Sequence, residues 1–472
     1  MASLKVIPLA AATLFSVGAI AATDDMVSRS ELNKIVAAAV EKALNERQEK
    51  LNAVMADKKA VEEKPVYGEV SDLNVQPGAK EKPAQEDPNR VVFSGYARYG
   101  VHYQADDLKY VGVDGSYNGA SSLGRLGNEG NGGEFQVTKF FRSEQGAIWD
   151  INVMIDHWGD EVNLKKSYAG VTQVLDSQPN SYIWAGRDFH QRLQQGINDY
   201  MVMNYDGQGA GIKNLELGST KLELGVVSAV EWCDPRLISD NNNPNPSRVT
   251  CTGGGGVGDS GHYALTSKLY NIDLGVADLE LYGNYGFDSK AVDKDKRLNA
   301  WQSALVLGRG WEHGYNRLIV RYSNRADNSV YWKTEDLTTI FVSAEGSVNF
   351  SEKTAVEYLL AYHDFHIDGN EENNRANYGV IVRPMYFWND VHSTWLETGY
   401  QIVDYSEGGR NSGWKATLSQ NISIGMGSSF RPMLRFYVTA GEVDNKHNKN
   451  ILTNDDARLN ALNIGAMWEA WW

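Results

Sequence analysis

Aromatic and charged side chains share one face of the two strand-like runs that begin and end the body of the chain. Tyr96 and Arg98 alternate with apolar residues in the first run, and Glu469 and Trp471 do so in the last. Aromatic rings stack on flat apolar groups, and guanidinium groups make paired hydrogen bonds to oxygen atoms. These residue types therefore predict a surface that binds a ligand noncovalently.

Motifs for covalent or metal chemistry are weak. The glycine run at 253–256 is not followed by the Gly-Lys-Ser/Thr of a phosphate-binding loop. His363 and His366 are three residues apart, so an extended chain places them on opposite faces. No motif fixes two carboxylates at the separation that glycoside hydrolysis requires. We predict that the chain is not an enzyme and binds no metal and no cofactor.

Alternation with a period of two recurs along the chain after residue 90. The C-terminal run has an apolar face made of Leu462, Ile464, Ala466, Trp468, Ala470 and Trp472. Comparable runs lie at 221–227, 278–287, 317–323, 378–388 and 431–438. Arginines fall on one side of such runs, as Arg317 and Arg321 do opposite Leu318. This pattern predicts strands with one polar and one apolar face.

A β-sandwich and a β-barrel both alternate in this way, so periodicity alone does not separate them. Composition favours the barrel, because 24 Tyr and 13 Trp accompany 46 Gly while mean hydropathy stays at -0.43. Alternating lipid-facing and lumen-facing residues give this mixture. A chain that ends on an aromatic residue in an alternating strand is also typical of outer-membrane barrels. We predict an all-β fold, an antiparallel transmembrane β-barrel over 91–472 in contact with outer-membrane lipid.

The N-terminus resembles a secretory signal. Lys5 provides a positive charge, residues 6–20 are apolar, and Ala19-Ile20-Ala21 offers small residues for cleavage after Ala21. No later apolar run reaches the roughly 20 residues that a membrane-spanning helix needs. Residues 1–21 are therefore predicted to be a signal peptide, and the protein to lie in a bacterial outer membrane.

Residues 22–63 are rich in helix-forming residues and are predicted to form a short periplasmic coiled coil. One heptad seam consists of Ala37, Val40, Leu44, Leu51, Val54 and Val61. A single solvated helix is the alternative. Residues 64–90 contain four prolines among charged residues, so we expect an extended linker there.

The two cysteines, Cys233 and Cys251, flank a stretch rich in Asn and Pro. In a secreted protein their default state is one disulfide, here closing an external loop. They have no His at ligand spacing, which argues against zinc. The net charge of -15 argues against nucleic acid as a partner.

Six motifs occur in an order that resembles the maltoporin family of carbohydrate-specific outer-membrane porins. They are Gly95-Tyr96-Ala97-Arg98, Arg125-Leu126-Gly127-Asn128-Glu129, Ile183-Trp184-Ala185-Gly186-Arg187 with Gln191-Arg192, Gly207-Gln208-Gly209-Ala210-Gly211, Arg383-Pro384-Met385-Tyr386 and Met467-Trp468-Glu469-Ala470-Trp471-Trp472. The N-terminal extension is similar to that of the sucrose-porin branch. The resemblance implies a homotrimer of 18-stranded barrels, each with its own channel for sugars.

The resemblance also implies which residues line the channel. Its aromatic slide would consist of Tyr96, Phe135, Trp158, Tyr315 and Trp471. Phe135 fits only if one residue is inserted at 130–133, and Trp158 resembles an aromatic residue that reaches across from a neighbouring subunit. The polar track and constriction would consist of Arg98, Arg125, Lys166, Arg192, Asp199, Met201 and Asn204.

Three of these positions depart from the family pattern. Lys166, or Lys165 beside it, replaces an arginine, Asn204 replaces an aspartate, and Met201 replaces a tyrosine. Lysine and asparagine cannot make the paired hydrogen bonds that arginine and aspartate make. The resemblance to maltoporins therefore does not imply that this channel prefers maltodextrins. The sugar could be sucrose, a β-glucoside or a short maltodextrin. A general diffusion porin and a secreted carbohydrate-active β-sandwich enzyme are the competing functions.

Overall fold

The computed structural model describes residues 89–230, 259–448 and 458–472. The predicted signal peptide (1–21), coiled coil (22–63) and linker up to residue 88 lie outside these ranges, as do Cys233 and Cys251. Among the described residues, no helix is long and apolar enough to cross a membrane.

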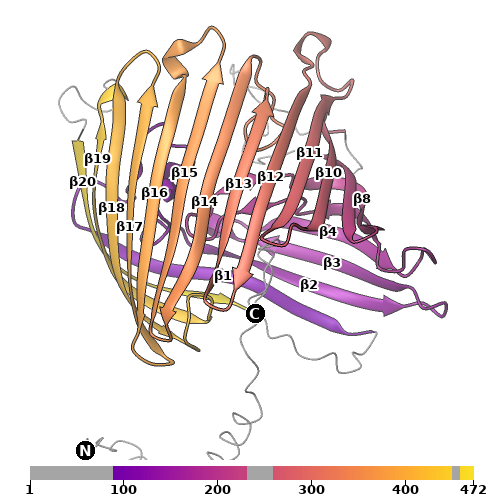
Figure 1. Cartoon of the computed structure of the whole chain (residues 1–472), viewed down its shortest axis with the longest axis horizontal. Coiled ribbons are helices and arrows are strands. Elements are labelled where there is room, and N and C mark those ends of the chain that lie inside the picture. Colours follow the sequence, from indigo (N-terminus) through magenta and orange to yellow (C-terminus); the bar gives the residue numbers. More distant parts are fainter. Residues whose placement is uncertain (1–88, 231–258, 449–457) are drawn as a thin grey trace, which may run out of the picture. The chain divides into compact units, whose positions relative to one another are not determined.

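Antiparallel strands of the described residues form one closed 18-stranded sheet, because the first strand pairs with the last (Figure 1). The barrel strands are β1 (Val91–Gln104), β2 (Gly132–Arg142), β3 (Ile148–Asp156), β4 (Asn163–Thr172), β5 (Tyr182–Asp188), β8 (Gly207–Leu217), β9 (Thr220–Ser228), β10 (His262–Asp273), β11 (Asp278–Asp288), β12 (Ala300–Trp311), β13 (Gly314–Asn324), β14 (Leu337–Ser351), β15 (Thr354–Ile367), β16 (Arg375–Phe387), β17 (His392–Tyr405), β18 (Arg410–Ser423), β19 (Met433–Asn445) and β20 (Arg458–Trp471). The predicted barrel and its strand number are confirmed.

Shorter elements lie in the connections. The 3-10 helices are η1 (Gly119–Leu123), η2 (Trp158–Asp160), η4 (Lys294–Lys296), η5 (Glu371–Asn373) and η6 (Lys446–Asn448). β6 (Leu193–Gln194) and β7 (Met201–Met203) form a small separate hairpin between β5 and β8. The main sheet therefore contains every described strand except these two.

The barrel wall has an apolar outer face and a polar inner face. On β19, Leu434, Phe436 and Val438 are exposed, whereas Arg435 between them is buried. On β13, Leu318 is exposed while its neighbours are buried. Alternation of this kind lets lipid contact one side of each strand while charges stay inside. The predicted strand parity is confirmed.

Connections at one end of the barrel are short and those at the other are long. The turns at 218–219, 312–313 and 352–353 lie at the end that holds the start of β1 and the end of β20. At the opposite end, β1 is joined to β2 by residues 105–131, β5 to β8 by 189–206, and β13 to β14 by 325–336. We name these the first, second and third inserted segments, because each packs against the inner wall.

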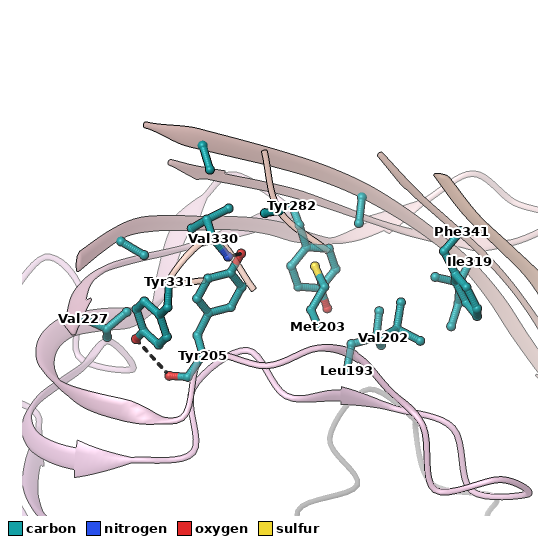
Figure 2. Packing of buried hydrophobic residues seen from close by; sticks show 14 of the residues in the cluster. Leu193, Val202, Met203, Tyr205, Val227, Tyr282, Ile319, Val330, Tyr331 and Phe341 are labelled. Carbon is teal, nitrogen blue, oxygen red and sulfur yellow. Dashed lines mark hydrogen bonds between the residues drawn. The ribbon is translucent and has the colours of Figure 1, made fainter. Parts of the chain in front are cut away.

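Apolar contacts hold the second and third inserted segments against the wall (Figure 2). Their buried side chains include Leu193, Val202, Met203, Tyr205, Val330 and Tyr331, which meet Val227, Tyr282, Ile319 and Phe341 of the wall strands. Burying an aliphatic or aromatic side chain stabilises by roughly 1.5–3 kcal/mol. This core therefore keeps the second segment inside the barrel.

The first inserted segment contacts the opposite side of the wall and also the second segment. Val111 and Leu123 pack against Val403 of β17. A Cβ atom on Gly399 would lie 2.2 Å from the Leu123 carbonyl oxygen, so only glycine permits this approach. The Arg125 amide donates to the carbonyl oxygen of residue 197 at 3.2 Å. The inner space is thus narrowed from two sides.

Candidate functional site

An aromatic surface lies where the barrel closes. Tyr96 of β1 is paired with Trp471 of β20, and their rings stack at 6.4 Å between centroids with 25° between planes. Trp158, from the connection between β3 and β4, lies 6.3 Å from the Tyr96 ring. The three rings form adjoining flat faces, which we call the aromatic surface.

Trp158 makes its contacts in this structure with residues of its own chain. The Arg98 guanidinium lies 5.2 Å from its ring centroid. A Cβ atom on Gly132 would lie 2.3 Å from the indole, so the glycine at the start of β2 makes room for it. The connection between β3 and β4 therefore delivers this ring to the aromatic surface of the same barrel.

Charged groups border the aromatic surface. Arg98 donates through Nη1 to Asp199 Oδ2 at 2.8 Å and to Tyr96 Oη at 3.2 Å. Asp199 belongs to the second inserted segment and has a left-handed backbone, with φ of 55°. Its other oxygen lies 3.9 Å from Arg125 Nη1. Flat aromatic faces with charged hydrogen-bonding groups at their rim can bind a ring that has apolar faces and a hydroxyl edge.

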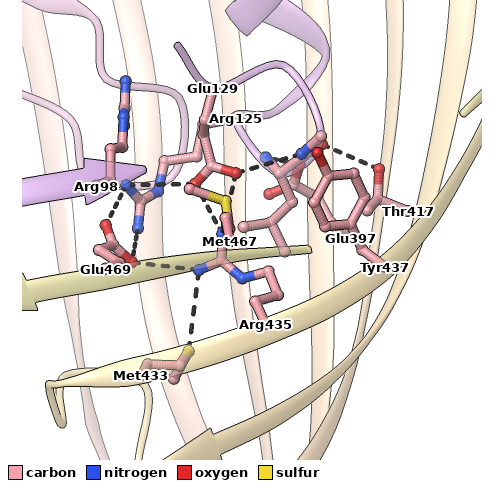
Figure 3. A network of polar contacts seen from close by, with 12 residues as sticks. Arg98, Arg125, Glu129, Glu397, Thr417, Met433, Arg435, Tyr437, Met467 and Glu469 are labelled. Atoms are coloured by element: carbon pink, nitrogen blue, oxygen red, sulfur yellow. Dashed lines mark hydrogen bonds and ion pairs between the residues drawn. The ribbon is translucent and has the colours of Figure 1, made fainter. Parts of the chain in front are cut away.

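Glu469 is the centre of a buried ion network behind this surface (Figure 3). Arg125 of the first inserted segment lies 2.7 Å from its Oε1. Arg431 and Arg435, near the start of β19, lie 2.6 Å and 3.2 Å from its Oε2. Tyr96 donates to the same carboxylate at 2.9 Å. One carboxylate thus holds the inserted segment, the wall and the aromatic surface together.

A second carboxylate, Glu129, balances the excess positive charge. Both of its oxygens accept from Arg435 Nη1, at 2.8 Å and 2.9 Å. Burial alone would raise the pKa of Glu129, but Arg435 and Arg125 outweigh burial and hold this pKa below its usual range. Glu129 is therefore ionised at neutral pH, and three arginines share two carboxylates.

Further charges extend into the barrel from the aromatic surface. Lys166 of β4 lies 3.5 Å from Asp188, and Arg192 forms an ion pair with Asp206. The Phe189 ring lies between the two cations, 4.4 Å from the Lys166 nitrogen and 3.3 Å from the Arg192 guanidinium carbon. Cation–π contacts of this kind fix the long cationic side chains in place.

A β-bulge places both neighbouring lysines on the inner side. The register between β3 and β4 shifts so that Lys165 has no partner residue. Lys165 Nζ lies 3.1 Å from the buried Asp156, while Lys166 approaches Asp188. A bulge can do this because two residues oppose one on the neighbouring strand. Both lysines therefore bring their charge to the inner side of the barrel.

Phe135 is the one proposed slide residue that the structure contradicts. It shares its face of β2 with the exposed Val137 and lies 5.4 Å from the ring of Trp472, which is also exposed. Glu134, the preceding residue, lies near Arg192 and thus faces inward. Because strand neighbours face opposite sides, Phe135 belongs to the outer surface.

The remaining predicted residues are dispersed along the inner side. Tyr315 is on β13 in step with the buried Arg317, close to the short-turn end. Met201 and Asn204 are half-buried in the second inserted segment, and the Asn204 amide donates to the Asn328 carbonyl oxygen at 3.1 Å. Met201 and Asn204 thus lie beside the third inserted segment.

Arg431, Arg435 and Glu469 were not among the proposed site residues. Strand parity groups Arg431 with Arg435 on one face of their strand and Glu469 with Trp471 on one face of theirs. Parity does not show that the two strands are neighbours in the barrel. Their pairing is the signal that was missing. Among the described residues, no group of three or more His, Cys, Asp or Glu side chains could hold a metal ion.

Replacing Glu469 by Gln should destabilise the barrel strongly, because three buried arginines would lose a shared counter-charge. Removing one partner of a buried ion pair costs about 3–5 kcal/mol. Urea unfolding in detergent, followed by tryptophan fluorescence, measures the change. The control variant Glu407→Gln lies in the exposed turn between β17 and β18. It should change the free energy of unfolding by less than about 0.5 kcal/mol. Equal shifts in the two variants would contradict the assigned network.

Comparison with known proteins agrees with this architecture. The family model described as LamB porin matches residues 91–472. Maltoporins from the El Tor Inaba and Classical Ogawa strains of Vibrio cholerae serotype O1 are each 28% identical over 431 residues, which is 81% of this chain and 95% and 94% of the relatives. Sequence similarity thus spans the whole barrel.

Solved structures with similar folds include Pseudomonas aeruginosa OccD3 (OpdP) and OpdQ. Each is 10% identical and covers 81% of this chain, with 91% and 98% of the other chain and TM-scores of 0.44 and 0.42. At these TM-scores the likeness adds nothing to the family match.

The family match identifies the barrel as an outer-membrane channel through which sugars diffuse. The predicted location is confirmed, and so is the prediction that the protein is a channel rather than an enzyme. The chain belongs to the LamB porin family.

Proposed function

We propose that this channel selects di- and oligosaccharides, which pass along the aromatic surface with their hydroxyl groups toward the bordering charges. The proposal rests on the aromatic rings of Tyr96, Trp158 and Trp471, which adjoin one another. The paired charges of Arg98 and Asp199 lie beside these rings. A pyranose ring has two apolar faces and a hydroxyl rim, so it matches flat rings flanked by charge-assisted donors and acceptors.

A general diffusion porin is the competing function. Such a channel needs charged groups in its lumen but no adjoining aromatic faces. The contact between Tyr96 and Trp471, and the placement of Trp158 against Arg98, favour sugar selection over simple sieving. The polar track would consist of Arg98, Arg125, Lys166, Arg192, Asp199, Met201 and Asn204, with Tyr315 further along the path.

Three positions bear on which sugar is preferred. Lys166 is a point charge where the family has an arginine, and Asn204 is neutral where the family has an aspartate. Met201 offers no hydroxyl group. These changes weaken the case for long maltodextrins and leave sucrose, β-glucosides and short maltodextrins as candidates.

Block of single-channel current tests the proposal directly. Purified protein in a planar bilayer should show concentration-dependent block by some of sucrose, cellobiose and maltotriose. The open-chain polyol sorbitol, tested at matched osmolarity, lacks the ring face and should block weakly. Equal and weak block by every solute would favour the general diffusion porin.

Assembly is a separate part of the proposal. We propose a homotrimer, as the resemblance implies, with residues 22–63 forming a periplasmic coiled coil after removal of residues 1–21. Unheated protein should migrate on an SDS gel as a trimer that becomes a monomer on heating. A variant without residues 22–89 should keep the barrel, because β1 begins at Val91. A strictly monomeric species in mild detergent would contradict the trimer.

Adjacent tryptophans at the C-terminus should have different roles. Trp471 stacks on Tyr96 and lies 4.5 Å from the Arg431 guanidinium carbon, whereas Trp472 is exposed on the outer face. Trp471→Ala should weaken sugar block by about 1 kcal/mol, the scale of one aromatic contact, with little change in ion conductance.

Trp472→Ala is the matched control for that variant. It should reduce insertion and assembly while leaving sugar affinity normal in the protein that reaches the membrane. Normal sugar block in Trp471→Ala together with lost block in Trp472→Ala would reverse the assigned faces of β20.

Met201 should set part of the channel width. Met201→Tyr adds a rigid phenol to a half-buried position of the second inserted segment, so ion conductance should fall. Met201→Leu keeps the side-chain volume and should leave conductance close to that of the parent. If the tyrosine variant conducts as the parent does, Met201 does not line the narrowest section.

A further inference from the structure

A cavity of about 260 Å³ lies between the ends of β4, β5 and β9 and the second and third inserted segments. Its lining includes Lys165, Arg187, Asn204, Asp206, Asn328 and Trp332. None of these residues belongs to the aromatic surface, and of them only Asn204 is shared with the proposed polar track. We propose that this vestibule cavity is a separate binding site for a single sugar ring that carries an anionic group.

Charge on the lining favours an anionic group. Asp206 is engaged by Arg192, whose Nε donates to Oδ1 at 3.2 Å, and Asp156 is engaged by Lys165 at 3.1 Å. Within the described ranges, no hydrogen bond or ion pair reaches the guanidinium of Arg187. Asp206 and Asp156 are near enough to act on Arg187 electrostatically, but both pair directly with other cations. The planar fork of Arg187 is therefore left without a direct partner, and it matches a carboxylate or phosphate group.

Amide groups in the cavity are placed for hydroxyl groups. Asn204 Oδ1 accepts from the Asp206 amide at 2.8 Å, which leaves its NH₂ group as a donor. Asn328 donates to the Met201 carbonyl oxygen at 3.3 Å, which leaves its side-chain oxygen as an acceptor. A sugar hydroxyl both donates and accepts, so one donor and one acceptor on neighbouring segments suit it.

Trp332 supplies the face for the ring. Its side chain is 60% exposed although it belongs to the third inserted segment rather than to the lipid-facing wall. The next residue, Lys333, is bound to Asp288 at 2.7 Å, which ties this part of the segment to β11. Small-molecule sites usually enclose about 300–1,000 Å³, so this volume suits one sugar ring and not an oligosaccharide.

Isothermal calorimetry on the full-length protein in detergent tests the site with glucuronate, glucose 6-phosphate and glucose. Glucuronate or the phosphate should bind about tenfold more tightly than glucose, and comparison of the two acids shows whether carboxylate or phosphate is preferred. Arg187→Gln should abolish this advantage. Trp332→Ala, in an exposed part of the segment, should weaken binding of the acidic sugars without loss of folding.

Two controls separate this site from other sources of affinity. Arg410→Gln removes an equally positive but distant side chain at the same end of the barrel, and it should leave acid-sugar binding unchanged. Trp471→Ala should also leave it unchanged, while Arg187→Gln should leave block by neutral disaccharides intact. Equal losses of acid-sugar binding in Arg187→Gln and Arg410→Gln would overturn the separate site, and so would loss of acid-sugar binding in Trp471→Ala. Neither result would contradict the proposed path for neutral sugars.

Discussion

The buried carboxylate of Glu469 is the contact on which the site depends. It lies where the barrel closes and accepts from Arg125 of the first inserted segment and from Arg431 and Arg435 of the wall. Burying charges is costly unless they are paired, so each arginine is confined to positions that reach this carboxylate. The same group accepts from Tyr96, and the ion network therefore orients the aromatic surface.

Packing of the inserted segments turns a wide barrel into a lined channel. Apolar contacts hold the second segment against the wall, and that segment presents Asp199 to Arg98. The third segment is fixed by Asp327, which accepts from His363 at 3.0 Å and pairs with Arg321. Burial opposes ionisation of Asp327, but Arg321 and His363 outweigh it and keep its pKa below the usual range.

Strand alternation made much of this fold predictable from sequence, because a membrane barrel must face lipid on one side and charge on the other. It assigned Tyr96 and Trp471 to the inner face. It could not supply registers between strands, so the bulge at Lys165 was missed. Phe135 was assigned from the family resemblance, with an inserted residue at 130–133, and this placed it on the wrong face of β2. Contacts between distant segments, such as Glu469 with Arg125, depend on long-range pairing that no local pattern records.

A sugar ring on the aromatic surface would depend on Glu469, which holds that surface in place. A structure of the protein determined with a saturating disaccharide tests this placement of the ring most directly. One sugar ring should lie in van der Waals contact with the indole of Trp471 and the phenol of Tyr96, with its hydroxyl groups toward Arg98 and Asp199. A disaccharide bound elsewhere in the lumen, with the two rings uncovered, would contradict it.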